Sequence, residues 1–477
     1  MSHYDVWDSC ERPFPSGCCK LGHLFVCNGV NVTHVDNFAD EIPQHCTSLT
    51  IANANNSFIN NGYWKFLSNL TYLEDLAFYN NKISSLSDLK PVYIEDLENL
   101  KFLTLAFGEL RTFPVEIFHT LASLEYLSLQ CNKLQNISEG NWNFPLLNNL
   151  IMSHNRIATV GIKHFKGLEN LAELDLSYNR ISHFSLKVLD SMPNLKYLRL
   201  SFNQLVYISD FSHQHAHLLY FALSSNLFVS LEGSVFNGLK SVRTIEFSSN
   251  SIKDPPSVNS KNNVTSALAL SLESNLIEVL SPLFFDHFPY LNLINVDFNR
   301  IHHIEENTFR SVPNVTSISM RGNAIHIIPR QLFQHLQNLN FIELQVNRIQ
   351  NLDPYIFNQL SKHVQVYIQN NPIVCDCQAL PLLKWLSASG MSIMHFPTCQ
   401  SPKPLENQNI YYATLPQDCP ASTLMPVSTN VTPTEHPNTF KDQNTLIFLI
   451  GLLLAPLICS CLIPLCAVCR SSHEDSE

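Results

Sequence analysis

Apolar residues recur through the middle of the chain in the pattern LxxLxLxxNxL, in which x is variable and an Asn keeps a fixed place. Two clean copies occupy residues 171–181 and 195–205. The pattern occurs 13 times over residues 81–371, about once every 24 residues. The Asn place is held by Asn81, Gly108 (a substituted copy), Asn132, Asn155, Asn179, Asn203, Asn226, Asn250, Asn275, Asn299, Asn323, Asn347 and Asn371. A period of this length predicts a solenoid in which each copy is one coil, stable only against its neighbours.

Each copy contains the elements of one coil. The LxL alternation predicts a short strand whose apolar side chains point to one side. We expect the Asn side chain to hydrogen-bond backbone groups where the strand turns, forming a ladder along the stack. An aromatic residue often lies ten positions after the Asn and predicts a buried spine on the convex side. The spine residues are Phe118, Trp142, Phe165, Phe236, Phe285, Phe309, Phe333 and Phe357.

Two copies depart from the regular spacing. The step from Asn81 to Gly108 is 27 residues long, with the surplus near Pro91. A later copy contains Pro255 and Pro256 and has Ser260 where the spine aromatic is expected. We predict local irregularities at both places.

A long apolar segment follows the repeats. Residues 445–469 run for 25 residues without a charge, enough to cross about 30 Å of hydrocarbon as a tilted helix. Residues 420–444 are rich in Thr, Pro and Ser and predict an extended stalk. Residues 470–477 would form a cytoplasmic tail, too short for a signalling domain. A GPI signal is an alternative, which the polar residues after the apolar segment disfavour.

Cysteines gather at the two ends of the repeats, where an open solenoid needs caps over its exposed core. The two groups are Cys10, Cys18, Cys19 and Cys27, and Cys375, Cys377, Cys399 and Cys419. Disulfides in these groups require an oxidising compartment, and zinc binding by the C-x-C pair is the less favoured alternative. Cys46 takes a repeat-Leu place and predicts a core residue. Cys131 is either a free thiol or a partly buried, inert one.

On these residues the chain resembles extracellular leucine-rich-repeat proteins, a plan shared by Toll-like receptor ectodomains, adhesion proteins and variable lymphocyte receptors. The resemblance covers roughly residues 10–419 and implies an α/β solenoid, a horseshoe with a parallel concave β-sheet. It also implies disulfide caps at both ends, with bonds Cys375–Cys399 and Cys377–Cys419. The N-terminal cysteine spacing departs from the family's pattern and leaves its pairing open. We take Cys10–Cys19 with Cys18–Cys27 as the prediction.

The predicted organisation follows from these features. The order is an N-terminal cap (1–45), repeats (46–373), a C-terminal cap (374–419), a stalk (420–444), a transmembrane helix (445–469) and a cytoplasmic tail (470–477). N-glycosylation sequons occur at Asn31, Asn55, Asn69, Asn136, Asn263, Asn314 and Asn430. Cys469, at the inner boundary of the apolar segment, is a candidate for palmitoylation.

Composition and motifs exclude several function classes. The formal charge of −11 disfavours binding to nucleic acid, and 45% hydrophobic residues with 30 Phe exclude intrinsic disorder. The chain lacks G-x-S-x-G, P-loop, H-E-x-x-H and kinase motifs, so we expect neither an enzyme nor a cofactor. His213, His215 and His217 alternate and would converge on a metal only in an extended segment; solvated loop histidines are the favoured reading.

The location is predicted from the caps rather than from a signal. Residues 1–27 contain several charged residues and no apolar stretch typical of a signal peptide. A tail-anchored chain with cytosolic repeats is therefore an alternative, but paired cap cysteines would have no role there. We expect a single-pass plasma-membrane protein with extracellular repeats.

The concave strands carry the candidate binding residues. Aromatic residues and Arg are the usual anchors of protein interfaces. The predicted ligand-binding residues are Phe102, Tyr126, Tyr178, Tyr197, Arg199, Phe202, Tyr220 and Arg243, with Phe107 nearby. Farther along, these strand places hold small, acidic or amide side chains. We predict a recognition or adhesion receptor or co-receptor for a protein ligand; the alternatives are a structural, matrix-organising protein and a decoy immune-type protein.

Overall fold

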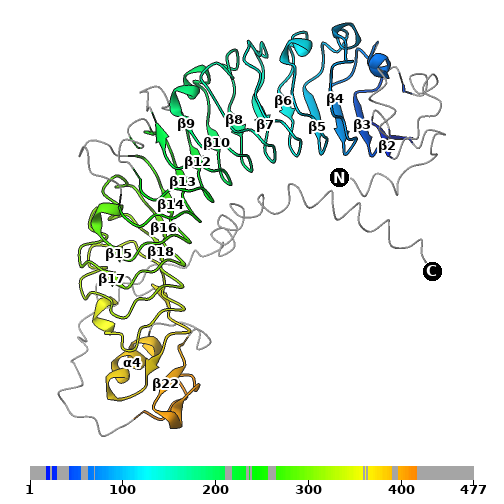
Figure 1. Cartoon of the computed structure of the whole chain (residues 1–477). Helices are drawn as coiled ribbons and strands as arrows, with labels where there is room; N and C mark the ends of the chain where they lie inside the picture. Colours follow the sequence, from blue (N-terminus) through cyan, green and yellow to red (C-terminus); the bar gives the residue numbers. More distant parts are fainter. Residues whose placement is uncertain are drawn as a thin grey trace, which may run out of the picture. The chain divides into compact units, whose positions relative to one another are not determined.

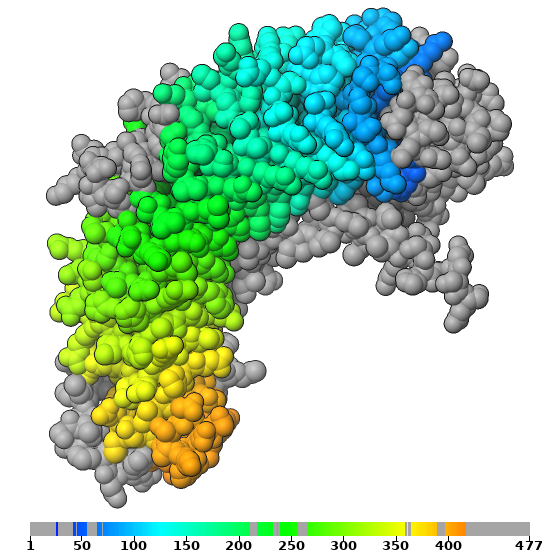
Figure 2. All heavy atoms as spheres, viewed as in Figure 1, coloured from blue at the N-terminus to red at the C-terminus, as the bar shows by residue number. Residues whose placement is uncertain are grey.

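The computed structural model describes residues 18–21, 24–28, 42–43, 45–54, 63–68, 70–209, 217–231, 236, 239–255, 265–357, 360, 364–388 and 396–415. The chain divides into two units, Met1–Met425 and Pro426–Glu477, and every described residue belongs to the first. In this unit the coils follow one another in chain order along a curved stack (Figure 1). The colours in Figure 2 change gradually along the stack, as expected if each coil packs on the coils next to it in sequence.

A single sheet of 16 strands runs through the stack. Its first pair is antiparallel, and each later pair of neighbours is parallel, as the repeat predicted. The strands are β1 (Cys18–Leu21), β2 (Leu24–Asn28), β3 (Ser48–Ala52), β4 (Asp75–Tyr79), β5 (Phe102–Ala106), β6 (Tyr126–Ser128), β7 (Asn149–Ile151), β8 (Glu173–Asp175), β10 (Tyr197–Arg199), β12 (Tyr220–Ala222), β13 (Thr244–Glu246), β14 (Ala269–Ser271), β16 (Leu293–Asn295), β18 (Ser317–Ser319), β19 (Phe341–Glu343) and β20 (Gln365–Tyr367).

The predicted asparagine ladder is confirmed. Asn179 is buried, and its Nδ2 donates hydrogen bonds to the carbonyls of Met152 in the preceding coil and Leu176 in its own, both at 3.0 Å. Its Oδ1 accepts the backbone N–H of Ile157 at 3.0 Å. The same bonds recur at Asn203 and in later coils. Each Asn thus joins two coils, because it is the partner of a buried N–H of the preceding coil and bonds carbonyls of both coils.

The residue before each ladder position has a left-handed backbone, which the sequence did not reveal. Its φ lies between +50° and +57° at most of these positions, including 54° at Tyr178 and 57° at Phe202. At Gly322 φ is 68°, and a Cβ built there would lie 2.5 Å from the Phe298 ring. This conformation costs an L-residue roughly 1–2 kcal/mol, which the ladder bonds offset.

Outside the sheet, the described part of the repeats forms 3-10 turns where an α/β solenoid would have α-helices. A copy of about 24 residues leaves room for only a short return segment. The 3-10 turns are η2 (Tyr63–Leu67), η3 (Pro91–Tyr93), η4 (Val115–Phe118), η5 (Leu186–Ser191), η7 (Pro282–Phe284) and η8 (Pro354–Phe357). Two parallel strand pairs accompany them: β9 (Phe184–Ser185) with β11 (Ile208–Ser209), and β15 (Val279–Leu280) with β17 (His303–Ile304).

The aromatic spine is buried as predicted. Its ring centroids lie 6.2 Å apart between Phe309 and Phe333 and 6.3 Å between Phe333 and Phe357. All eight spine side chains are at most 3% exposed. The copy with Ser260 lacks the regular aromatic, and there the rings of Phe236 and Phe288 pack on each other with their centroids 4.9 Å apart. Ser260 lies outside the described residues.

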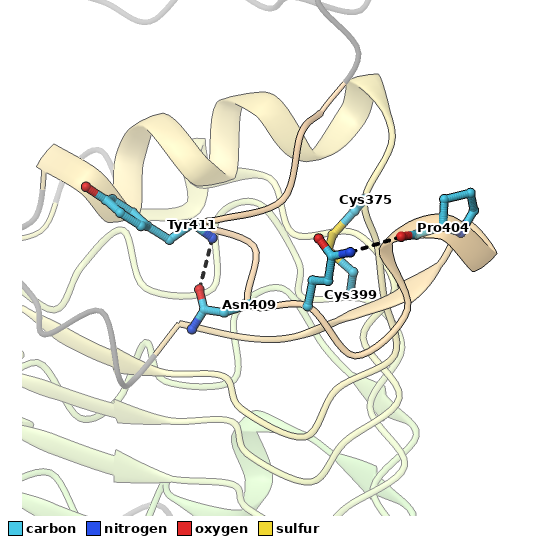
Figure 3. Close-up of a disulfide and its surroundings, with 6 residues drawn as sticks. Cys375, Cys399, Pro404, Asn409 and Tyr411 are labelled. Atoms are coloured by element: carbon cyan, nitrogen blue, oxygen red, sulfur yellow. Dashed lines mark hydrogen bonds between the residues drawn. A yellow bond between two sulfur atoms is a disulfide. The ribbon is translucent and has the colours of Figure 1, made fainter.

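The C-terminal cap covers the last coil. The predicted disulfide Cys375–Cys399 is present, and Figure 3 shows it beside Pro404, whose carbonyl accepts a bond from Gln408 at 3.0 Å. The elements of the cap are β21 (Ile373–Val374), η9 (Cys377–Ala379), α4 (Leu380–Ala388), β22 (Cys399–Ser401) and η11 (Lys403–Leu405). Trp385 of α4 stacks on the spine residue Phe357 at 4.7 Å, so the helix closes the exposed end of the core.

The other predictions about the cysteines can be compared with the structure only where the residues are described. Cys377 is disulfide-bonded, while Cys419 and Cys10 lie outside the described residues. The backbone register sets Cys18 opposite Cys27, but their side chains, and that of Cys19, are not described. Cys46 is 1% exposed, which confirms it as a core residue, and Cys131 is half-buried.

The membrane prediction concerns residues 445–469, which also lie outside the described part. Within the described part, none of the helices has the length and apolar character that a bilayer crossing needs. Asn136 and Asn314 are exposed and lie outside the strands. The remaining predicted sequons (Asn31, Asn55, Asn69, Asn263 and Asn430), as well as His213, His215 and Cys469, fall outside the described residues.

Candidate functional site: the inner face of the sheet

Two rows of side chains run across the inner face of the sheet. The middle side chain of each three-residue strand points into the core, so the residues before and after it lie on the opposite side of the sheet. We call these the first row and the second row. Ser128 and Ala222 on that side are themselves buried. From β5 to β13 the first row is Phe102, Tyr126, Asn149, Glu173, Tyr197, Tyr220 and Thr244. The second row is Thr104, Ser128, Ile151, Asp175, Arg199, Ala222 and Glu246.

A chain of polar contacts links five of these strands. Asn149 Nδ2 donates to Glu173 Oε2 at 2.7 Å, and Arg199 Nε donates to Glu173 Oε1 at 3.1 Å. The Arg199 guanidinium lies over the Tyr220 ring, 5.1 Å from its centroid, and the Tyr220 hydroxyl donates to the Glu246 carboxylate. We call these five residues the polar chain. It fixes the orientation of Arg199 and Tyr220 before any partner arrives, which reduces the entropy cost of binding.

Acidic side chains outnumber the single Arg in and beside the polar chain. Burial raises the pKa of Glu246 and of the neighbouring Asp175, against the attraction of Arg199. Burial also raises the pKa of the Tyr220 hydroxyl, so this group stays protonated. Three acidic side chains, those of Glu173, Asp175 and Glu246, thus lie near one guanidinium, and burial opposes the ionisation of two of them. The arrangement favours a partner that brings donors or positive charge.

A stack of three rings borders the second row. His154, Tyr178 and Phe202 follow one another on successive coils, with centroids 3.9 and 4.0 Å apart and nearly parallel planes. We call them the ring stack. All three occupy the left-handed position before the ladder Asn. Their faces cover one another, so the stack presents ring edges to a partner.

The predicted site residues fall into groups that the sequence did not separate. Tyr197 and Arg199 share β10, and Tyr197 is 40% exposed beside Tyr220. Phe102 and Tyr126 form a separate pair with centroids 6.3 Å apart. Arg243 is exposed in the turn before β13 and lies outside both rows.

The placement of Tyr178, Phe202 and Phe107 in strands was wrong. β8 ends at Asp175, β10 at Arg199 and β5 at Ala106, and each aromatic follows in the turn. Most strands span three residues because the ladder Asn turns the chain soon afterwards. Tyr178 and Phe202 therefore lie at the edge of the inner face rather than within it.

Sequence reasoning missed the partners that hold these anchors. Asn149, Glu173 and Glu246 complete the polar chain, and His154 begins the ring stack. The available signal was the repeat itself, since residues at equal places in successive copies become neighbours. In the described part of the chain, no group of three His, Cys, Asp or Glu side chains is arranged to hold a metal ion.

A second polar cluster lies farther along the face. Asp297 Oδ1 accepts hydrogen bonds from the Ser319 hydroxyl at 2.5 Å and the Arg321 N–H at 2.7 Å. Asn295 donates to Glu273 at 3.1 Å. Burial raises the pKa of Asp297 to about 6, and the carboxylates of Glu343 and Glu273 act in the same direction, against the two hydrogen bonds.

This raised pKa predicts a pH-dependent stability. The folded protein keeps a proton on Asp297 up to about pH 6, whereas the unfolded chain releases it near pH 4. The contribution of this group to stability therefore rises as the pH falls from about 6 to about 4. We expect Asp297→Asn to be more stable than the wild type at pH 7.5, with the difference shrinking toward pH 4. Denaturation midpoints across this range test it, and a difference independent of pH would contradict it.

Comparison with known proteins agrees with this architecture. A family model described as leucine rich repeat matches residues 98–157, 145–205 and 268–325. Human leucine-rich repeats and immunoglobulin-like domains protein 3 is 28% identical over 162 residues, 34% of this chain and 13% of that protein. Mouse podocan is 26% identical over 160 residues, 33% of this chain and 25% of that protein. The chain thus spans a quarter or less of these relatives' lengths.

Solved structures share the fold at low sequence identity. The TLR13–ssRNA13 complex gives a TM-score of 0.62 at 21% identity, covering 79% of this chain and 58% of that one. The mouse RP105/MD-1 complex gives 0.54 at 19% identity, covering 77% of this chain and 58% of that one. At these identities the likeness concerns the fold alone.

Proposed function

We propose that this chain, whose coils match the leucine rich repeat model, is an extracellular leucine-rich-repeat protein that acts as a cell-surface recognition or adhesion receptor. Its partner would be a protein that binds the inner face between β6 and β13. The observation that carries the proposal is the polar chain beside the exposed Tyr197, which presents an Arg and two Tyr side chains in fixed positions. Arg and Tyr are enriched among the residues that dominate binding energy at protein interfaces.

The proposal includes a place for the protein at the plasma membrane. Residues 445–469 would cross the bilayer and residues 420–444 would hold the repeats away from it. The Cys375–Cys399 disulfide supports an oxidising, extracellular location for the repeats. A protein partner agrees with the RP105/MD-1 complex, in which a similar fold is bound to another protein.

Proximity labelling on intact cells tests the proposal, using the full chain fused to a labelling enzyme. Tyr197→Ala is the main variant, because it removes an exposed anchor and leaves the contacts of Arg199 in place. We expect labelling of the partner to fall about 30-fold, the effect of losing roughly 2 kcal/mol at a central anchor. Tyr290→Ala, an exposed tyrosine outside both rows, is the matched control and should label as the wild type does.

The labelled proteins also separate the two classes of function. Membrane proteins among them support a receptor or co-receptor, and matrix components alone would support a structural protein instead. Equal labelling by wild type and Tyr197→Ala, with equal melting temperatures, would contradict a binding role for this part of the face.

A further inference from the structure

A row of positive charges runs along one flank of the solenoid, next to the inner face. The residue directly after the ladder Asn is Lys133, Arg156 and Arg180 in three successive coils. Each backbone N–H donates to a carbonyl of the preceding coil: Lys133 to Leu110 at 2.8 Å, Arg156 to Leu134 at 2.8 Å, and Arg180 to Ile157 at 2.9 Å. This repeated bond keeps the three residues in register. We call them the cationic row.

The row is only partly neutralised. Lys133 pairs with Glu109 at 3.0 Å. Arg156 and Arg180 are exposed, and neither forms an ion pair with another described residue. Two residues after Arg156 and Arg180 lie the uncharged Ala158 and Ser182. Two residues before them lie His154 and Tyr178 of the ring stack. Two guanidinium groups are therefore available on adjacent coils.

Stability alone does not account for this arrangement. Neighbouring strands lie about 4.8 Å apart, so the row is about 10 Å long and places like charges close together. Like charges at such spacing repel and destabilise the folded state slightly. The chain as a whole carries a formal charge of −11, so the row stands out against the rest of the molecule.

We propose that the cationic row binds a linear sulfated polysaccharide. A row of charges repeated from coil to coil is complementary to a polymer whose sulfate groups are also spaced along a line. Arg suits this role because its planar group donates two parallel hydrogen bonds to an oxyanion such as sulfate. The cationic row shares no residue with the first or the second row of the inner face. Polysaccharide binding by this row therefore does not depend on the function proposed above.

The ring stack argues against nucleic acid as the polyanion. Single-stranded nucleic acids are held chiefly by bases that stack on aromatic faces. Here the faces of His154, Tyr178 and Phe202 cover one another at 3.9 and 4.0 Å, so a base has no place between them. The edges and the neighbouring guanidinium groups suit sulfates and hydroxyls instead.

Heparin is the probe, immobilised and presented to the purified full-length protein at 0.15 M salt. We expect Arg156→Gln with Arg180→Gln to weaken binding about tenfold, since two exposed charge contacts are lost. The matched control replaces Arg300 and Arg348, which are exposed at the same coil position but separated by Ala324. This control should bind nearly as the wild type does.

Each further outcome decides the proposal. Arg156→Gln with Arg180→Gln should melt at or slightly above the wild-type temperature, because repulsion between adjacent coils is removed, and the control should melt as the wild type does. Weaker binding then cannot be attributed to unfolding. Tyr197→Ala should retain heparin binding, which separates this site from the inner face. Desulfated heparin should not bind. Failure of the wild type to bind heparin, equal binding by Arg156→Gln with Arg180→Gln, or equally strong binding of polyglutamate would overturn the assignment.

Discussion

Replacing Asn179 by Ala is expected to lower the free energy of unfolding by about 3 kcal/mol. The side chain is buried, and its Oδ1 accepts the Ile157 N–H. The two hydrogens of Nδ2 reach the carbonyls of Met152, Leu176 and Ser177, so one of these bonds is shared. Ala would leave the buried Ile157 N–H without a partner, since water cannot reach it between packed coils. It would also remove one of the two ladder donors from each of the Met152 and Leu176 carbonyls, which keep their bonds to Asn155 and Asn203. Equilibrium unfolding in denaturant measures the loss.

Two further variants identify the ladder as the cause. Asn179→Asp keeps the acceptor but loses the donor and sets a carboxylate against three carbonyls, so it should cost more than Ala at pH 7. Asn170→Ala is the control, because Asn170 is exposed and donates a single bond, to Pro145 at 2.8 Å. Its cost should be about 0.5 kcal/mol. Similar losses for Asn179→Ala and Asn170→Ala would mean that the ladder contributes little.

The ladder also explains why so much of the fold could be predicted from the sequence. The Asn and the LxL alternation recur at fixed intervals, and each has one physical role that is the same in every coil. The parallel sheet, the buried Asn side chains and the aromatic spine all follow from that repetition. The Cys375–Cys399 bond was predicted from family resemblance rather than from physical chemistry, and it is present.

The left-handed position and the polar chain could not be predicted from the sequence of a single copy. The left-handed position before the ladder Asn accepts His154, Tyr178, Phe202 and several Ser residues alike, so its backbone could not be predicted from residue type. The polar chain likewise depends on register. Glu173 and Arg199 are 26 residues apart in sequence and contact each other diagonally, because the register sets Glu173 opposite Tyr197, two residues before Arg199. The repeat predicts that register, but it does not predict the side-chain rotamers that bring these groups into contact.

The stacking of coils also places acidic and basic side chains on different surfaces, according to their position within the repeat. Places on the inner face collect carboxylates, such as Glu173, Asp175 and Glu246, around one Arg. The place after the ladder Asn collects cations on the flank. A change at one place in one copy alters a row rather than an isolated site, because side chains at that place are neighbours from coil to coil. Two surfaces of opposite charge can therefore coexist within one repeat.

Removing the Cys375–Cys399 disulfide is expected to destabilise the C-terminal cap by about 3 kcal/mol. The bond closes a loop with a sequence separation of 24, and the unfolded cap gains the corresponding freedom once it is lost. Both cysteines are buried, so Cys375→Ala with Cys399→Ala keeps the interior apolar. Because Trp385 stacks on Phe357, loosening of the cap would also uncover the last spine residue.

Hydrogen exchange across residues 364–388 and 396–415 measures this effect, together with denaturant midpoints. We expect faster exchange in the cap and in the coil that it covers, and unchanged exchange in the coil of Asn179. A single Cys399→Ala variant should fare worse than the double variant, since it leaves the buried Cys375 thiol able to form wrong disulfides. If the double variant and the wild type exchanged at equal rates throughout the cap, the packing of α4 on the last coil, rather than the disulfide, would be what keeps the end of the solenoid closed.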